Sequence, residues 1–116
     1  MVGQYTPAIQ RLVDAVLTTP GATSPAFRRS VEGRAAVLGG RSTGEMTADI
    51  PSELTSYIDK VALHAYKVTD EDVEALREAG YSEDAIFEIT LSAALGAGLA
   101  RLERGLAALR GDNNAP

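Results

Sequence analysis

The sequence predicts an all-α domain, and three observations support this fold class. Apolar residues recur at spacings of three and four along most of the 116 residues, which is the period of a helix with one buried face. No run of alternating polar and apolar residues is long enough to predict a strand. Ser, Thr and Pro precede the apolar runs and Gly follows them, as at helix starts and stops. We therefore expect one bundle of five or six helices over residues 1–110 and a disordered tail over 111–116.

Two helices are expected in the first third of the chain. Thr6-Pro7 has the form of an N-cap followed by proline at the first helical position, and residues 18–21 end this helix. Ser24-Pro25 starts a second helix in the same way, and Gly39-Gly40 stops it. The polar loop over residues 39–50 is long for a small domain, so we expect it to be functional or mobile.

Two further helices are expected between residues 51 and 80. Pro51 opens the first of them, and Leu63 falls opposite its apolar side, which predicts a broadly buried helix. That apolar side consists of Leu54, Ile58, Val61, Ala62, Ala65 and Val68. Thr69 then begins a short helix as an N-cap with three acids in its first turn, and Gly80 ends it.

A long last helix is expected after its N-cap, Ser82. Its leucines recur at threes and fours, namely Leu95, Leu99, Leu102, Leu106 and Leu109. Small residues form a second set, namely Ala93, Ala94, Gly96, Ala97, Gly98, Ala100 and Gly105. A glycine inside a helix costs up to about 1 kcal/mol relative to alanine, so we expect another helix to approach closely here, within the chain or between subunits. The alternative is a ligand that lies against the helix backbone.

Charge and helix chemistry argue against a nucleic-acid partner. The net charge is −5, and residues 51–89 alone carry three basic and ten acidic residues, a net −7, whereas phosphate binding requires an excess of bases. The Thr69–Ser82 unit has the form of a helix-turn-helix. The helix that follows starts with Glu83 and Asp84, where a base-reading helix would carry Arg, Lys, Asn or Gln.

Residue content also excludes several kinds of chemistry. The chain has no cysteine, which removes disulfides, thiolate metal sites and thiol-based mechanisms. The acids of the short helix lack the spacing of a calcium loop, and helix capping accounts for most of them. We therefore expect no metal and no cofactor. Residues 1–8 carry no targeting signal and no segment is expected to span a membrane, so we expect a cytoplasmic protein without a membrane partner.

The stretch from Glu53 to Glu88 resembles the alkylhydroperoxidase AhpD-like family, also called the carboxymuconolactone decarboxylase family. Family members show a Glu, about a dozen residues later a Cys-x-x-Cys, and then a His after three more residues. An Ala-Gly turn, a Ser-x-x-x-Ile element and an acid follow. The run AGYSEDAI at residues 79–86 anchors this pattern without a gap. The resemblance implies a helical, oligomeric AhpD-like domain, and we expect a homo-oligomer.

The same alignment shows where this chain departs from the family. The two Cys positions fall on Ala65 and Val68, and the His position falls on Asp72, so that only Glu53 carries over. A thiol-dependent peroxidase is therefore excluded. Carboxymuconolactone decarboxylases do not depend on the Cys pair. The resemblance implies that they use a His near the position of Asp72 and a nearby Trp, and this chain has neither.

These departures leave several hypotheses open. The first is a degenerate member of the family that binds a small molecule or a protein partner. The second is a non-redox enzyme, a lyase or isomerase, in which Glu53 acts as acid or base together with Tyr66, His64 or Asp72. A third is a subunit that complements a Cys-containing paralogue. A lone histidine such as His64 is more often a packed or surface residue than a catalyst.

The enzyme hypothesis makes a geometric demand on Glu53. On one straight helix, Glu53 and Ala65 would lie about 18 Å apart at 1.5 Å per residue. Acid–base chemistry at the family's site therefore predicts a helix break between Ser52 and Ala65, or Glu53 at a subunit interface, together with a buried carboxyl. The competing interpretation is that Glu53 only complements the dipole of its helix.

Overall fold

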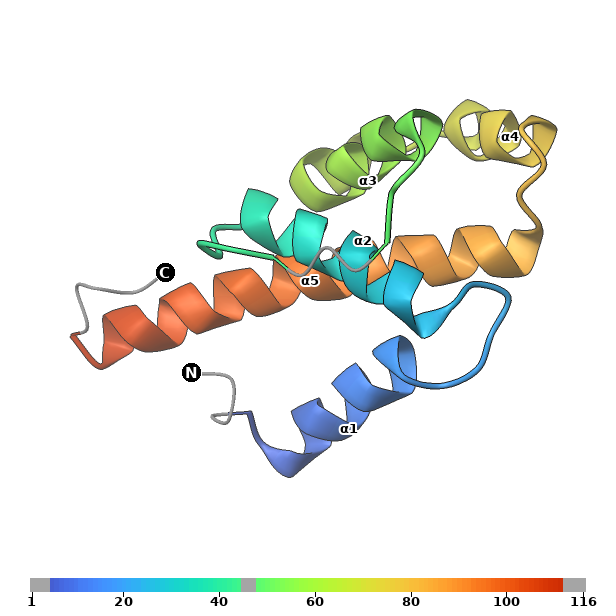
Figure 1. Cartoon of the computed structure of the whole chain (residues 1–116). Helices are drawn as coiled ribbons and strands as arrows, with labels where there is room; N and C mark the ends of the chain where they lie inside the picture. Colours follow the sequence, from blue (N-terminus) through green and yellow to red (C-terminus); the bar gives the residue numbers. More distant parts are fainter. Residues whose placement is uncertain (1–4, 45–47, 112–116) are drawn as a thin grey trace.

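The computed structural model describes residues 5–44 and 48–111, and this part of the chain contains helices and their connections but no strand (Figure 1). The all-α fold class is confirmed. The elements are α1 (Pro7–Leu17), α2 (Pro25–Leu38), α3 (Ser52–His64), the short 3₁₀ turn η2 (Ala65–Lys67), α4 (Asp70–Glu78) and α5 (Glu83–Leu109). The polar loop and the C-terminal tail are described only in part, because residues 45–47 and 112–116 lie outside the described residues.

Side-chain caps start four of the helices at the predicted residues. The hydroxyls of Thr6, Ser24 and Ser82 each accept a hydrogen bond from the backbone N–H three residues later, at 3.1–3.2 Å. Thr69 forms a full capping box with Asp72, in which each side chain bonds the other residue's backbone N–H. These bonds satisfy N–H groups that a helix start otherwise leaves without a partner.

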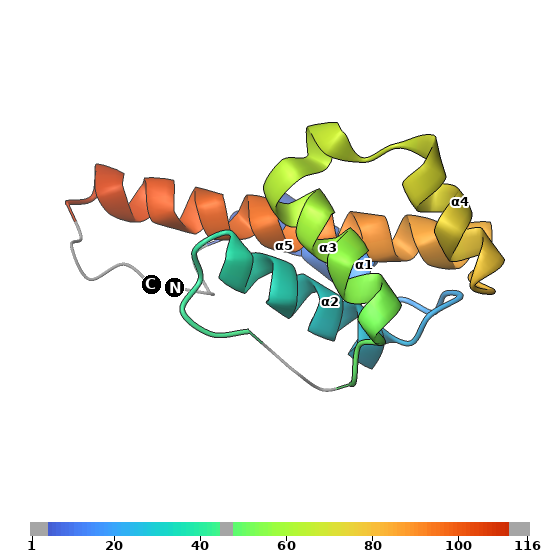
Figure 2. The same ribbon diagram turned by 90° about the horizontal axis from the view of Figure 1, so that it is seen from above.

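The long helix α5 is the element on which the rest of the domain is assembled. At 27 residues it is about 40 Å long. Helices α1, α2, α3 and α4 all contact it, and Figure 2 shows α3 crossing above α2 and α5. In both views the C-terminal turns of α5 project beyond α3 and α4 (Figures 1 and 2). The core between these helices contains Val31, Ala35, Leu54, Ile58, Val61, Ile86, Ile89, Ala93 and Ala97.

The small residues of α5 divide between two faces of the helix. Four of them are buried in the domain, namely Ala93, Gly96, Ala97 and Ala100. At Gly96 the backbones of α2 and α5 approach so closely that an added methyl group would overlap the carbonyl oxygen of Glu32. Ala94, Gly98 and Gly105 are exposed instead, and a methyl group at either glycine would meet no neighbouring element within 4 Å. Close packing within the chain therefore explains only the buried half.

Helix α3 is less buried than its sequence predicts. Leu54, Ile58, Val61 and Ala62 are buried as expected, but Leu63 is 43% exposed and Ala65 is exposed as well. The expectation of a broadly buried helix is wrong, because α2 and α5 cover only one side of α3. The helix also ends at His64, whose backbone turns to φ −145° and ψ 53°. Ala65 therefore does not continue the apolar side, and Val68 joins the core as a partly buried residue.

A network of charged residues attaches the first part of the polar loop to α2 and α5. Arg41 donates hydrogen bonds to Glu103 at 3.0 and 3.2 Å and to Glu32 at 3.0 Å. Both carboxylates are nearly buried. The Tyr5 hydroxyl donates a further hydrogen bond to Glu103, and burial followed by this bond raises the pKa of Tyr5 to about 12. The described residues of this loop thus have a structural role.

Candidate functional site

Glu53 lies in the first turn of α3, where its side chain is exposed. Its carboxylate Oε2 accepts a hydrogen bond from the hydroxyl of Tyr81, at 2.9 Å. Tyr81 lies in the turn between α4 and α5, and its partial burial, followed by the hydrogen bond to Glu53, raises the pKa of its hydroxyl. The buried carboxyl that the acid–base hypothesis requires is not found, because the start of α3 is on the surface of the domain.

Asp72, the second candidate acid, is engaged in two structural interactions. It closes the capping box of α4 through the Thr69 N–H, at 2.9 Å. It also accepts two hydrogen bonds from the Lys60 ammonium, at 2.9 and 3.0 Å. The backbone N–H of Thr69 and then the Lys60 ammonium lower the pKa of Asp72. A carboxylate held ionised in this way is a weak base.

Glu53 and Asp72 line the same pocket between α3 and α4. It has a volume of about 210 Å³ and is lined by Glu53, Ser56, Tyr57, Lys60, Asp72, Ala75 and Leu76. The Tyr57 hydroxyl is 2.6 Å from the Thr90 hydroxyl of α5. Within the pocket Lys60 and Asp72 bond each other, whereas Glu53 bonds Tyr81, which lies outside the lining.

His64 and Tyr66, the other two candidates, lie at the opposite end of α3. Their rings meet edge to face, with centroids 6.1 Å apart. The Lys67 ammonium lies 5.8 Å from the centre of the Tyr66 ring. Tyr66 is 81% exposed and so has the environment of a surface residue.

No helix break brings these two groups back to Glu53. Helix α3 is continuous from Ser52 to His64, a separation of about 16 Å between Glu53 and His64 along the helix. The break expected between Ser52 and Ala65 is present only at the end of that range, at His64, so it does not shorten the separation of Glu53 from His64. The four candidate residues therefore occupy two separate places within one chain.

Glu88, the acid that ends the family-like stretch, has a structural role. Its carboxylate accepts hydrogen bonds from the N–H groups of Ala22 and Thr23 and from the Thr23 hydroxyl, at 2.6–2.8 Å. Burial alone would raise the pKa of Glu88, but these hydrogen bonds and the charge of Arg28 outweigh it and lower the pKa. This interaction therefore stabilises the fold at pH values above the ordinary pKa of a glutamate. The stabilisation is lost as the pH falls through the lowered pKa of Glu88.

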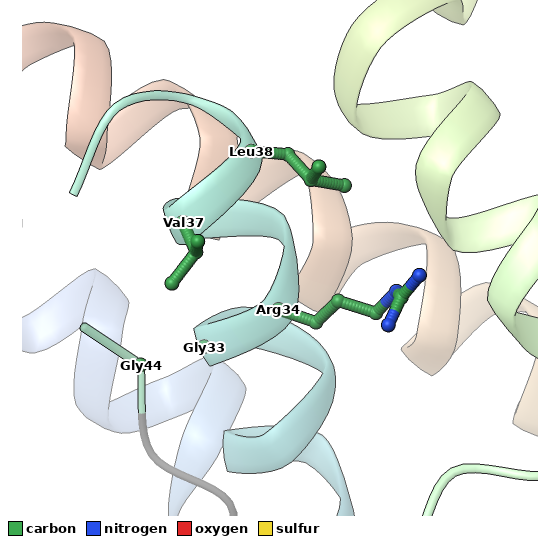
Figure 3. A pocket seen from close by; sticks show the side chains of 5 residues that line it. All are labelled: Gly33, Arg34, Val37, Leu38 and Gly44. Carbon is green, nitrogen blue, oxygen red and sulfur yellow. The ribbon is translucent and has the colours of Figure 1, made fainter. Parts of the chain in front are cut away.

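A second pocket is lined by α2 and the loop after it, and none of the four candidate residues is part of its lining (Figure 3). Its volume is about 270 Å³, and it is lined by Gly33, Arg34, Val37, Leu38 and Gly44. The guanidinium of Arg34 forms a two-pronged ion pair with Asp59 of α3, at 2.7 and 2.8 Å. The remaining lining residues carry no polar side chain, so this pocket offers apolar surface and no acid–base group.

Within residues 5–44 and 48–111, no three His, Cys, Asp or Glu side chains are grouped in a way that could hold a metal ion. By length and composition alone, α5 could cross a membrane. Half of its most apolar 18-residue stretch is, however, buried within the domain. Buried core helices of globular proteins have the same properties.

Comparison of the chain with family models, with curated proteins and with solved structures finds no match. The AhpD-like resemblance therefore remains a prediction that rests on the residues between Glu53 and Glu88.

Sequence reasoning missed Tyr81 as the partner of Glu53. The two residues are 28 positions apart, and their contact depends on how α4 places the next turn beside the start of α3. The one local signal was that Tyr81 lies within the AGYSEDAI run of the resemblance.

Glu53→Gln is expected to lower the free energy of unfolding by at most about 1 kcal/mol, because an exposed charge in a first turn contributes little. Glutamine can still accept the hydrogen bond from Tyr81. Urea unfolding at pH 7 would measure the change, with Tyr81→Phe as the matched variant that removes the same bond from the other side. A loss of more than about 3 kcal/mol, typical of a broken buried pair, would contradict a surface role for Glu53.

Proposed function

We propose that the protein is a Cys-less AhpD-like helical module that acts by binding a protein partner, and that it assembles into a homo-oligomer without catalysing a reaction. The observation that carries this proposal is the exposed side of α5, which we call the outer face. It consists of Phe87, Leu91, Ala94, Gly98, Leu102, Gly105 and Leu109, all of them exposed.

The outer face is unusual for the surface of a monomer. None of its seven residues carries a charge or a hydrogen-bonding side chain. Phe87 is 65% exposed and Leu109 is 85% exposed. Gly98 and Gly105 each cost about 1 kcal/mol relative to alanine in an exposed helix, and no packing within the described chain offsets this. Contiguous apolar surface of this kind is typical of a protein–protein interface.

Acid–base catalysis by Glu53 has less support than binding. The hydroxyl that bonds Glu53 belongs to Tyr81, whose raised pKa makes it a weaker proton donor at neutral pH. His64 lies about 16 Å away along α3, and Asp72 is already bonded to Lys60. With no thiol in the chain, reduction of a peroxide by the family's mechanism has no nucleophile.

A small-molecule ligand also has less support than a protein partner. The pockets on α2 and between α3 and α4, at about 270 and 210 Å³, are smaller than most ligand sites, which enclose roughly 300–1,000 Å³. A larger hollow of about 440 Å³ is lined by five residues of α4 alone. Four of these five are charged, namely Asp70, Glu71, Glu74 and Arg77, so it lacks the apolar walls of a typical ligand site.

The proposal is tested by the mass of the protein in solution. The monomer mass is 12.2 kDa, and we expect light scattering to give at least twice this value at micromolar concentrations. Leu102→Glu should reduce the mass to that of the monomer, because it places a charge in the centre of an apolar contact. Leu63→Glu is the matched control, since Leu63 is 43% exposed on α3 and Leu102 is 36% exposed, and it should leave the oligomer intact. The proposal would be overturned if the wild-type protein stayed monomeric at micromolar concentrations and at concentrations 100-fold higher.

A further inference from the structure

The residues of the outer face are arranged symmetrically about Gly98. Leu102, Gly105 and Leu109 follow it at four, seven and eleven positions, and Ala94, Leu91 and Phe87 precede it at the same intervals. At 100° per residue the seven positions stay within a band about 80° wide. An eleven-residue spacing keeps a seam on one side of a nearly straight helix.

We propose that a second copy of this chain binds along the outer face with α5 antiparallel to α5, and that the two-fold axis passes next to Gly98. This inference rests on the proposed function and specifies its geometry. In such an isologous pair, each residue faces the one at the mirrored interval from Gly98. Leu91 therefore faces Gly105 of the partner subunit, and Ala94 faces Leu102 of the partner subunit.

The sizes of the facing side chains support the antiparallel arrangement. Each of these two leucines meets a residue with little or no side chain, so that large groups fill the space that small ones leave. At the centre, Gly98 meets its own counterpart, which allows the two backbones to approach closely. A parallel pair in register would place Leu91 against Leu91 and Gly105 against Gly105. It would therefore be crowded at one level and open at another.

The charges of α5 support the same arrangement. Its first turn carries Glu83 and Asp84, and Arg110 is its C-cap. In the proposed register Arg110 lies opposite Ile86 of the partner subunit, within one turn of these two acids. Antiparallel pairing places the acidic end of one helix beside the basic end of the other and opposes the two helix dipoles. Parallel pairing would place like charges together at both ends.

Disulfide trapping tests the direction of the helices directly, because the natural chain has no cysteine to interfere. Phe87→Cys and Leu109→Cys proteins, one of them carrying an affinity tag, are mixed in a glutathione redox buffer. We expect the mixture to form a disulfide between the two variants. Neither variant alone should form one, since two copies of position 87 would lie about 33 Å apart at 1.5 Å per residue. Efficient disulfide formation by Phe87→Cys alone would indicate a parallel pair and overturn the inference.

A size exchange tests the register. Gly105→Leu should weaken dimerisation at least tenfold, since the new side chain collides with Leu91 of the partner subunit. Leu91→Ala together with Gly105→Leu should restore the affinity to within about threefold, because the large and small residues have changed places. Circular dichroism would show that each variant keeps its helices.

The outcomes separate this inference from the proposed function. A monomeric wild-type protein would overturn both. If Leu102→Glu disrupts the oligomer, the proposed function stands. The antiparallel geometry alone would then be overturned if Phe87→Cys formed a disulfide with itself, or if the size exchange did not restore the affinity.

Discussion

Arg41→Leu is expected to destabilise the protein by about 3–5 kcal/mol, because it removes the cation that Glu32 and Glu103 share at a place where both carboxylates are nearly buried. Arg41 bonds Glu32 and Glu103 at the same time. Without it, these two carboxylates would repel each other in a position where water reaches neither freely. Urea unfolding followed by circular dichroism would measure the loss.

Arg104 provides the matched control for this substitution. It lies on the exposed side of α5, one position after Glu103, and donates a hydrogen bond to the carbonyl oxygen of Gly40 at 3.1 Å. Because Arg104 is exposed, Arg104→Leu should cost no more than about 1 kcal/mol. Adding Glu103→Leu to Arg41→Leu should recover part of the loss, since one of the two carboxylates is then gone. Equal effects of the two arginine substitutions would show that the network contributes no more than a surface ion pair.

The elements of the fold could be predicted from sequence because their signals are local. The hydroxyl of an N-cap bonds an N–H only three residues away. Thr6, Ser24 and Ser82 therefore indicate the start of a helix from the few residues around them. The glycines that end helices act over a similarly short range. Such signals also fixed the position of Asp72 in the first turn of α4, and a capping box explains it without any catalytic role.

The interactions between elements could not be predicted, because they join residues far apart in sequence. Arg41 and Glu103 are 62 positions apart, and nothing in the polar loop indicates which acid Arg41 reaches. The burial of α3 was overestimated for the same reason. Helical spacing shows which residues share a side of the helix, but it does not show that only one side of α3 has a neighbour.

The candidate site shows this limit most clearly. Alignment with the family pattern placed Glu53, Ala65 and Asp72 at one site, and the structure brings Glu53 and Asp72 to the same pocket. It leaves Ala65 exposed beyond the end of α3, next to Tyr66. Whether a partner subunit brings a further group to Glu53 is decided by the interface, and the outer face of α5 is where we expect that interface to form.

Helix α5 contains one glycine packed against α2, Gly96, and one exposed glycine two residues later, Gly98. The same substitution can therefore be compared at both positions. At Gly96 an added methyl group would overlap the Glu32 carbonyl oxygen and lie 3.1 Å from the backbone nitrogen of Ala36. Both neighbours are backbone atoms of α2, which cannot rotate away as a side chain could. Relief would require α2 and α5 to move apart along the whole of their contact, which loosens the core around Ala93 and Ala97.

Gly96→Ala is therefore expected to lower the free energy of unfolding by about 2 kcal/mol or more, despite a gain of up to about 1 kcal/mol in helix propensity.

Gly98→Ala receives the same gain in propensity two residues further on, where the added methyl meets no neighbouring element. At concentrations too low for dimerisation it should stabilise the monomer by up to about 1 kcal/mol. At higher concentrations the same methyl should weaken self-association, because it separates the two backbones at the two-fold axis. Urea unfolding at both concentrations, with light scattering in parallel, would distinguish these effects, and a Gly96→Ala protein as stable as wild type would contradict the close contact between α2 and α5.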